Sequence, residues 1–241
     1  MESTQLIQPA SGSNRTLVIM AKAPHPGTVK TRLAKSLSVE AVADLYRCLL
    51  HDTLALAHSV GGVKIAIMCP ASDADEMTQL AGDATIVVPQ HGAGLAAALI
   101  SVFAHFAAGG NRVIAFNSDS PHLPAPVLAS AFEMLAVHDV VVGPTYDGGY
   151  FLVGAKAAHT ALFHGDGMGT GSALDALLAR ARALNLSVCF TEPFYDIDVE
   201  GDLTRLAEEL RHAPERAPRT AAWLKRRQEM LPQQRTAAEN T

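Results

Sequence analysis

Three cations lie close together directly after the first apolar segment of the chain: Lys22, Lys30 and Arg32. Proteins bind a polyphosphate with several cations and with free backbone N–H groups, and a loop of this composition can supply both. Prolines stiffen the same segment, and Gly27 permits the backbone to approach a ligand closely. The glycine spacing of a Walker motif is not present. We interpret residues 20–33 as a phosphate-binding loop, with a solvated basic loop as the alternative.

Aspartates that could hold a divalent cation follow two later apolar segments. Asp119 lies three residues after the predicted strand 112–116, and Asp196 and Asp198 follow the run 187–191. Mg²⁺ and Mn²⁺ take one or two carboxylates together with substrate phosphates and waters. We predict that Asp119 is a metal ligand, with a turn as the alternative. Because Asp196 and Asp198 alternate, both would lie on one side of an extended chain, and either could supply a second carboxylate, although Asp198 could also cap the next helix.

A third candidate is the sequence Asp147-Gly148-Gly149, which separates the apolar stretches 139–145 and 150–154. A hairpin turn is sufficient to explain this sequence. In the functional interpretation, Asp147 accepts hydrogen bonds from a ribose or sugar hydroxyl, and the glycines let the ligand lie close.

Short apolar runs alternate with amphipathic segments, which predicts a mostly parallel sheet with helices on both faces. The predicted strands are residues 16–20, 63–68, 84–88, 112–116, 140–143, 150–154 and 187–191. The predicted helices are residues 39–60, 73–80, 94–108, 126–137, 170–184, 201–210 and 221–231. Ligands bind at the carboxyl ends of the strands in such sheets, and each candidate segment follows a predicted strand.

The composition limits the class of protein. Hydrophobic residues make up 49% of the 241 residues and charged residues 18%, which supports a packed core. The net charge of −5 disfavours nucleic acid as a partner, and no apolar run reaches the roughly 20 residues that span a bilayer. Three widely spaced cysteines form no zinc pattern and are typical of reduced thiols, so we expect a cytoplasmic protein without a membrane partner.

The chain divides into three predicted parts. Residues 1–15 are polar and aperiodic and are expected to form a disordered tail, and residues 16–211 form a single domain. Residues 212–241 form a basic helical extension that contains Trp223. We favour a solvated helix that packs this tryptophan onto the domain over a segment that binds a partner.

Four motifs together resemble a bacterial family that is described as glycosyltransferase-like, or as radical-SAM/selenodomain-associated transferases. They are Ala-Lys-Ala-Pro-x-Pro-Gly-x-Val-Lys-Thr-Arg-Leu at 21–33, Ser-Asp-Ser-Pro at 118–121, Gly-Pro-x-x-Asp-Gly-Gly-Tyr-Phe-Leu-Val-Gly at 143–154 and Asp-Ile-Asp at 196–198. The resemblance covers roughly residues 16–210. It implies a three-layer α/β/α domain of glycosyltransferase-A type, with added antiparallel strands, similar to nucleotide-diphospho-sugar transferases and small nucleotidyltransferases.

The resemblance also implies roles for individual residues. Asp119 and Asp198 would bind Mg²⁺ or Mn²⁺, and Lys22, Lys30 and Asp119 would be catalytic. The implied substrate-binding residues are Lys22, Gly27, Lys30, Arg32, Ser118, Asp147, Gly148 and Gly149. The implied reaction is a metal-dependent transfer from a nucleotide-sugar or a nucleoside triphosphate to a small-molecule acceptor. We further predict that the acceptor enters over the loop at residues 159–171, which could close as a lid; for its glycine-rich part at 165–171, a plain flexible loop is favoured over a lid or a phosphate loop.

Three segments depart from the family pattern. Residues 92–97 read Gly-Ala-Gly-Leu-Ala-Ala in place of Gly-Asp-Leu-Gly-x-Arg, and residues 168–170 read Met-Gly-Thr in place of Trp-Ser-Thr. Residues 117–122 read Asn-Ser-Asp-Ser-Pro-His in place of Gly-x-Asp-x-Pro-Asp. Glycosyl transfer is the leading interpretation; the alternatives are a guanylyltransferase-like nucleotidyl transfer that releases pyrophosphate and a catalytically silent nucleotide-binding protein. No dinucleotide-binding fingerprint follows the first strand, which disfavours a dehydrogenase.

Overall fold

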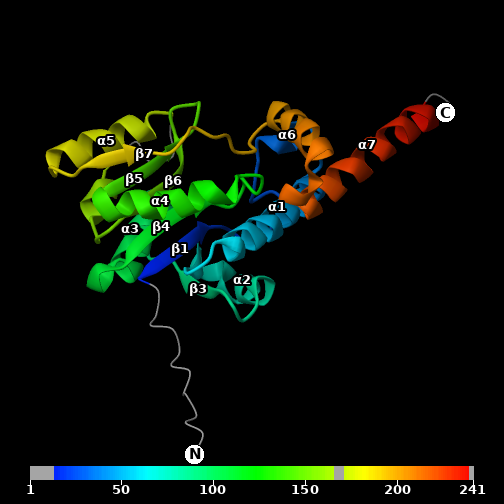
Figure 1. Cartoon of the computed structure of the whole chain (residues 1–241). Coiled ribbons are helices and arrows are strands. Elements are labelled where there is room, and N and C mark those ends of the chain that lie inside the picture. Colours follow the sequence, from blue (N-terminus) through cyan, green and yellow to red (C-terminus); the bar gives the residue numbers. More distant parts are fainter. Residues whose placement is uncertain (1–13, 166–170, 239–241) are drawn as a thin grey trace, which may run out of the picture.

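The computed structural model describes residues 14–165 and 171–238 and shows a seven-stranded sheet with helices on both faces (Figure 1). The strands are β1 Arg15–Met20, β2 Lys64–Cys69, β3 Ile86–Pro89, β4 Arg112–Asn117, β5 Val140–Pro144, β6 Tyr150–Ala155 and β7 Val188–Phe190. The helices are α1 Val39–Ser59, α2 Ala74–Ala81, α3 Gly94–Phe106, α4 Ala125–Val137, α5 Ala173–Ala183, α6 Glu200–His212 and α7 Pro218–Ala238.

The strand order across the sheet is β3-β2-β1-β4-β6-β5-β7. Strands β2, β1 and β4 are parallel to one another, as are β2 and β3, and only β6 runs antiparallel to both of its neighbours. The tight turn over residues 145–149 forces this reversal, because it joins β5 directly to β6. The predicted mostly parallel sheet with added antiparallel strands is confirmed.

The three layers follow from the alternation of side chains along the buried strands. Leu17 and Ile19 of β1 face one hydrophobic core, which α1, α4, α6 and α7 cover. Val18 between them faces a second core, which α3 and α5 cover. Because a strand buried on both faces is apolar at every position, these strands read in the sequence as continuous apolar runs.

The carboxyl ends of β1 and β4 form the point where the direction of winding reverses. From β1 the chain moves outward to β2 and β3 and then returns to place β4 on the other side of β1. Ligands bind at such a point in open α/β sheets. The phosphate-loop candidate follows β1 and Asp119 follows β4, so the fold brings these two segments together.

The C-terminal helix α7 packs along α1 and then extends beyond it to Ala238 (Figure 1). The side chain of Asp52 in α1 accepts hydrogen bonds from the first-turn N–H groups of α7, at 3.2 Å from Arg219 N and 2.8 Å from Thr220 N. Trp223 packs against the core below it. A carboxylate from another helix therefore caps the N-terminus of α7.

The predicted boundaries of the tail and of the extension can be placed on this structure. Residues 1–13 lie outside the described residues, and β1 already begins at Arg15. The predicted boundary between residues 211 and 212 lies in the last turn of α6, which ends at His212. Within the described residues, no helix is long and apolar enough to cross a membrane.

Candidate functional site

A cavity of about 870 Å³ lies at the carboxyl ends of β1 and β4. Six of the residues predicted for the site line it, namely Lys22, Lys30, Arg32, Ser118, Asp119 and Asp198. A smaller cavity of about 280 Å³ shares Arg32 and Asp198 with it and is also lined by Asp147 and Gly149. Gly27 and Gly148 are not among the residues that line either cavity.

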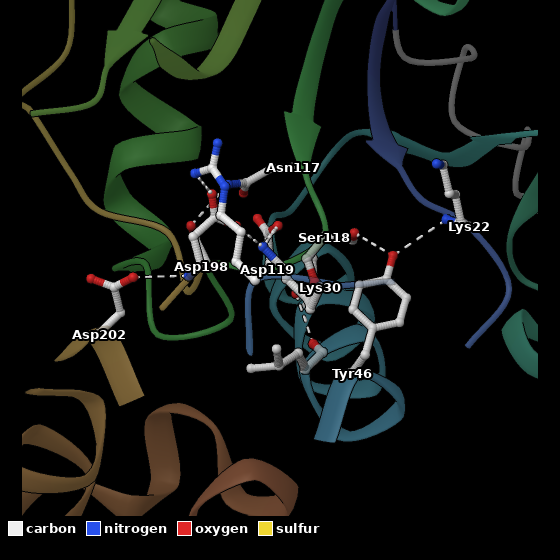
Figure 2. Close-up of polar contacts among 12 residues, drawn as sticks. Lys22, Lys30, Tyr46, Asn117, Ser118, Asp119, Asp198 and Asp202 are labelled. Carbon is white, nitrogen blue, oxygen red and sulfur yellow. Dashed lines mark hydrogen bonds and ion pairs between the residues drawn. The ribbon is translucent and has the colours of Figure 1, made fainter. Parts of the chain in front are cut away.

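The centre of the larger cavity is a cluster of one lysine and two aspartates (Figure 2). Lys30 Nζ contacts Asp119 Oδ2 and lies 2.7 Å from Asp198 Oδ1, and its side chain is only 8% exposed. Arg32 Nη1 lies 3.1 Å from the other oxygen of Asp198. Burial lowers the pKa of Lys30, but the charges of Asp119 and Asp198 outweigh burial and hold that pKa above its usual range. The amine of Lys30 is therefore protonated.

The loop that carries Lys30 is held at its N-terminal end by two side chains from other parts of the chain. Asp73 Oδ2 accepts a hydrogen bond from Ala23 N at 2.8 Å, and Tyr46 Oη accepts one from Lys22 N at 3.3 Å. Lys30 itself has φ of 45°, in the left-handed region that non-glycine residues rarely adopt. Such strained residues cost roughly 1–3 kcal/mol and cluster at functional sites, where the surrounding structure holds them in place.

Asp196 is a third carboxylate at this site, which the predicted pair of metal ligands omitted. Asp119, Asp196 and Asp198 each place one oxygen within 4.8 Å of the others. Burial, and then the charge of Asp119, raise the pKa of Asp196 to about 6. In the sequence, the alternation of Asp196 and Asp198 indicated that both side chains could face the site. The structure shows that both carboxylates lie there.

The alternative role of Asp198 as a helix cap is wrong. Helix α6 begins after Val199, and the carboxylate of Asp202 accepts the N–H groups of Asp198 at 2.9 Å and of Val199 at 2.8 Å. The side chain of Asp198 does not cap the helix but forms ion pairs with Lys30 and Arg32.

The acidic cluster has the chemistry of a site for a hard divalent cation. Its ligand atoms are all carboxylate oxygens, which suit Mg²⁺ and Mn²⁺. Asp119 Oδ1 is buried and accepts no hydrogen bond from any of the described residues. A buried carboxylate oxygen without a donor is costly unless a ligand completes it, so the residues present fit a metal ion.

Ser118 is tied into the wall of the cavity by a residue that sequence reasoning missed. Its hydroxyl lies 2.8 Å from the hydroxyl of Tyr46, which comes from α1 (Figure 2). Burial raises the pKa of Tyr46, so the phenol is neutral. Tyr46 lies within the apolar periodicity of its helix, where it reads as a core residue, and no sequence signal indicated that its hydroxyl would reach the site.

The Asp147 turn is built so that its carboxylate stays ionised beside the smaller cavity. Thr145 Oγ1 donates to Asp147 Oδ1 at 2.5 Å and Gly149 N donates to it at 3.2 Å, and the hydroxyl bond is the main reason that the pKa of Asp147 lies below its usual range. Gly148 has φ of 87°, and a Cβ there would meet Gly171 O at 2.1 Å. Gly148 therefore has a packing role, and residues 166–170 of the predicted lid lie outside the described residues.

His122, three residues after Asp119, is fully buried against two aromatic rings. Its ring centroid is 4.9 Å from that of Phe194 and 4.5 Å from that of Tyr195. Neither ring nitrogen has a hydrogen-bond partner among the described residues. Burial, and then the charge of Arg216, lower the pKa of His122 to about 3.

We expect the stability of the fold to decrease below pH 6.5 because of His122. The unfolded chain binds a proton at His122 near pH 6.5, whereas the folded chain does so only near pH 3, so stability falls as the pH falls between these values. His122 by itself is expected to lower the free energy of unfolding by about 2 kcal/mol at pH 5 relative to pH 7.5. Urea unfolding at both pH values measures it, and a His122→Phe variant should lose less stability than the wild type; equal losses in both would contradict this assignment.

The sequence resembles one known protein family over about half of its length. Residues 53–170 match the family model described as "Uncharacterized protein conserved in bacteria (DUF2064)". No curated protein matches the chain. A solved structure from Desulfovibrio desulfuricans G20, described as a "putative nucleotide-diphospho-sugar transferase", is 26% identical with a TM-score of 0.83, and the match covers 92% of this chain and 98% of that one.

Two more distant structures share the fold. The 4-diphosphocytidyl-2C-methyl-D-erythritol synthase of Anaerococcus prevotii DSM 20548 is 11% identical with a TM-score of 0.56, over 85% of this chain and all of that one. Rv0371C of Mycobacterium tuberculosis H37Rv, solved in complex with manganese, is 17% identical with a TM-score of 0.54, over 82% of this chain and all of that one. The chain is thus a single α/β domain with the nucleotide-diphospho-sugar transferase fold, and its residues 53–170 match the DUF2064 family.

Proposed function

We propose that this protein is a metal-dependent transferase that acts on a nucleotide-activated donor, with glycosyl transfer from a nucleotide-sugar to a small-molecule acceptor as the reaction. The observation that carries the proposal is the cluster of Lys30, Asp119 and Asp198 in a cavity at the carboxyl ends of β1 and β4. A similar structure described as a nucleotide-diphospho-sugar transferase supports the choice of donor. We also propose that the protein is cytoplasmic and that nucleic acid is not its substrate or partner.

The charged residues divide into two groups with different roles in this proposal. Asp119 and Asp198, together with Asp196, would hold Mg²⁺ or Mn²⁺, which supplies charge neutralisation at the leaving phosphate. Lys22 and Arg32 would bind the phosphates of the donor from the same cavity. Lys22, Lys30 and Asp119 are the proposed catalytic residues.

The remaining predicted residues would bind the donor and acceptor around this centre. Ser118 lines the larger cavity, and Asp147 and Gly149 line the smaller one, where the ionised Asp147 can accept hydrogen bonds from sugar hydroxyls. Gly27 and Gly148 would contribute backbone geometry, since both have positive φ.

Nucleotidyl transfer is the second candidate reaction. It is favoured by the number of cations that line the larger cavity, which suit a triphosphate. It would release pyrophosphate from the donor, whereas glycosyl transfer releases a nucleoside diphosphate. Analysis of the phosphate product therefore separates the two reactions.

The proposal is tested by a thermal-shift panel of nucleoside triphosphates and nucleotide-sugars, each with Mg²⁺, Mn²⁺ or EDTA. A ligand at 100 times its Kd adds about 2.7 kcal/mol of stability. A metal-dependent shift with one nucleotide-sugar supports glycosyl transfer, and a shift with a triphosphate alone supports nucleotidyl transfer. No shift with any ligand would overturn donor binding. Binding without turnover would indicate a silent binding protein, consistent with the departures at Ala93, Gly94 and Leu95 in the cavity wall.

A further inference from the structure

Cations of the chain itself already hold most of the carboxylate oxygens that Asp119 and Asp198 offer. Lys30 contacts one oxygen of each aspartate, and Arg32 contacts the second oxygen of Asp198. The remaining oxygen, Asp119 Oδ1, is the buried one without a donor among the described residues. The cluster is therefore nearly complete as a set of ion pairs.

A divalent metal would bind to the same group of carboxylates. The three carboxylates that could ligate it lie within 4.8 Å of one another, and Lys30 Nζ is paired with two of them. Repulsion between two cations at such short range is strong where little water screens it, and the side chain of Lys30 is 8% exposed. Lys30 and a metal ion therefore compete for the cluster.

We propose that Lys30 is the resident cation of the carboxylate cluster and that a divalent metal binds there by displacing it toward the phosphate side of the cavity. The role of the donor phosphate in this inference rests on the proposed function. Lys30 lines the same cavity as Lys22 and Arg32. A donor phosphate bound in this cavity can therefore form an ion pair with the Lys30 ammonium once Asp119 and Asp198 bind the metal instead.

The consequence is that metal and donor phosphate bind cooperatively. Metal binding frees Lys30 for the phosphate, and a bound phosphate keeps Lys30 away from the carboxylates. By linkage, each ligand strengthens the affinity of the other by the same factor. A metal without a donor binds weakly, because it has to break the ion pairs of Lys30 without compensation.

The test is a titration of the EDTA-treated full-length protein with MnCl₂ in the absence of nucleotide, with free Mn²⁺ measured by electron paramagnetic resonance. We expect Lys30→Gln to bind Mn²⁺ at least about tenfold more tightly than the wild type. Replacing a residue that contacts metal ligands typically changes the affinity for the metal by about 10–100-fold. Lys35→Gln is the matched control, because Lys35 is an exposed lysine close in sequence to Lys30 that does not line the cavity and forms no ion pair with a described residue. Its Mn²⁺ affinity should stay close to that of the wild type.

A second measurement uses the wild type, so that the test does not depend on the folding of a variant. Acetylation of lysines, read by mass spectrometry, should show that added Mg²⁺ increases the reactivity of Lys30 while that of Lys22 stays unchanged. Equal Mn²⁺ affinities in the wild type and Lys30→Gln, or unchanged reactivity of Lys30 at saturating Mg²⁺, would overturn the inference.

The outcome is separable from that of the proposed function. If no variant binds Mn²⁺, the inference fails, and the nucleotide panel in EDTA still reports whether a donor binds. If Lys30→Gln gains Mn²⁺ affinity and the double variant with Asp119→Asn loses that gain, the inference stands even when no nucleotide in the panel binds.

Discussion

Replacement of Asp119 by asparagine is expected to reduce affinity for the metal–nucleotide complex by at least about a hundredfold, or about 2.8 kcal/mol. The asparagine keeps the size of the side chain but removes the charge that a hard cation requires. The backbone contact between Ile197 N and Asp119 O, at 3.3 Å, does not depend on the side chain. Isothermal titration calorimetry with Mn²⁺ and the nucleotide identified by the thermal-shift panel measures the change.

A matched control separates the loss of a ligand from a change in net charge. Asp44→Asn removes one negative charge from an exposed pair with Arg47 on the surface of α1 and should leave the affinity unchanged. The thermal midpoint without ligand confirms that the Asp119→Asn protein is folded. A folded Asp119→Asn protein with wild-type affinity would remove Asp119 from the metal site.

Replacement of Asp52 by alanine is expected to destabilise the protein by about 3 kcal/mol, since three donors of the first turn of α7 lose their acceptor. Arg219 N and Thr220 N donate to its carboxylate, and the hydroxyl of Thr220 donates to it at 2.8 Å. Thr220 is fully buried, so water does not replace the lost acceptor without local opening. The thermal midpoint should fall by roughly 6–12 °C for a chain of this size.

Asp44→Ala is the control for this second prediction, because it removes an exposed carboxylate from the same helix. It should change the free energy of unfolding by less than about 0.5 kcal/mol. Circular dichroism during thermal unfolding measures both variants. An Asp52→Ala protein as stable as the wild type would show that the packing of α7 does not depend on this cap.

The elements of the fold could be predicted because their signals are local. Buried strands such as β1 and β4 read as short apolar runs, and glycines end or interrupt the helical periodicities between them. The turn at Asp147 predicted the antiparallel pair in the same way. The ends of the elements shifted by a few residues; the third strand, for example, was predicted over residues 84–88 and is found at Ile86–Pro89.

The main charged residues of the site could also be proposed from the sequence. In a parallel sheet the carboxyl ends of neighbouring strands meet at one edge, so polar residues that follow β1 and β4 had to come together. For this reason the sequence alone indicated that Lys30 and Asp119 are site residues, and the structure shows that they form an ion pair. Their specific roles in catalysis stay predictions.

Contacts between residues far apart in the chain were decided by the tertiary structure alone. Lys30 and Asp198 are separated by 168 positions, as are Asp52 and Thr220. The sequence by itself determined the elements and the residue types at the strand ends, because these depend on local periodicity and turn chemistry. Only the packed fold decided that Asp196 joins the acidic cluster and that Lys30 lies beside it, because side-chain direction and burial depend on neighbours that no local pattern encodes.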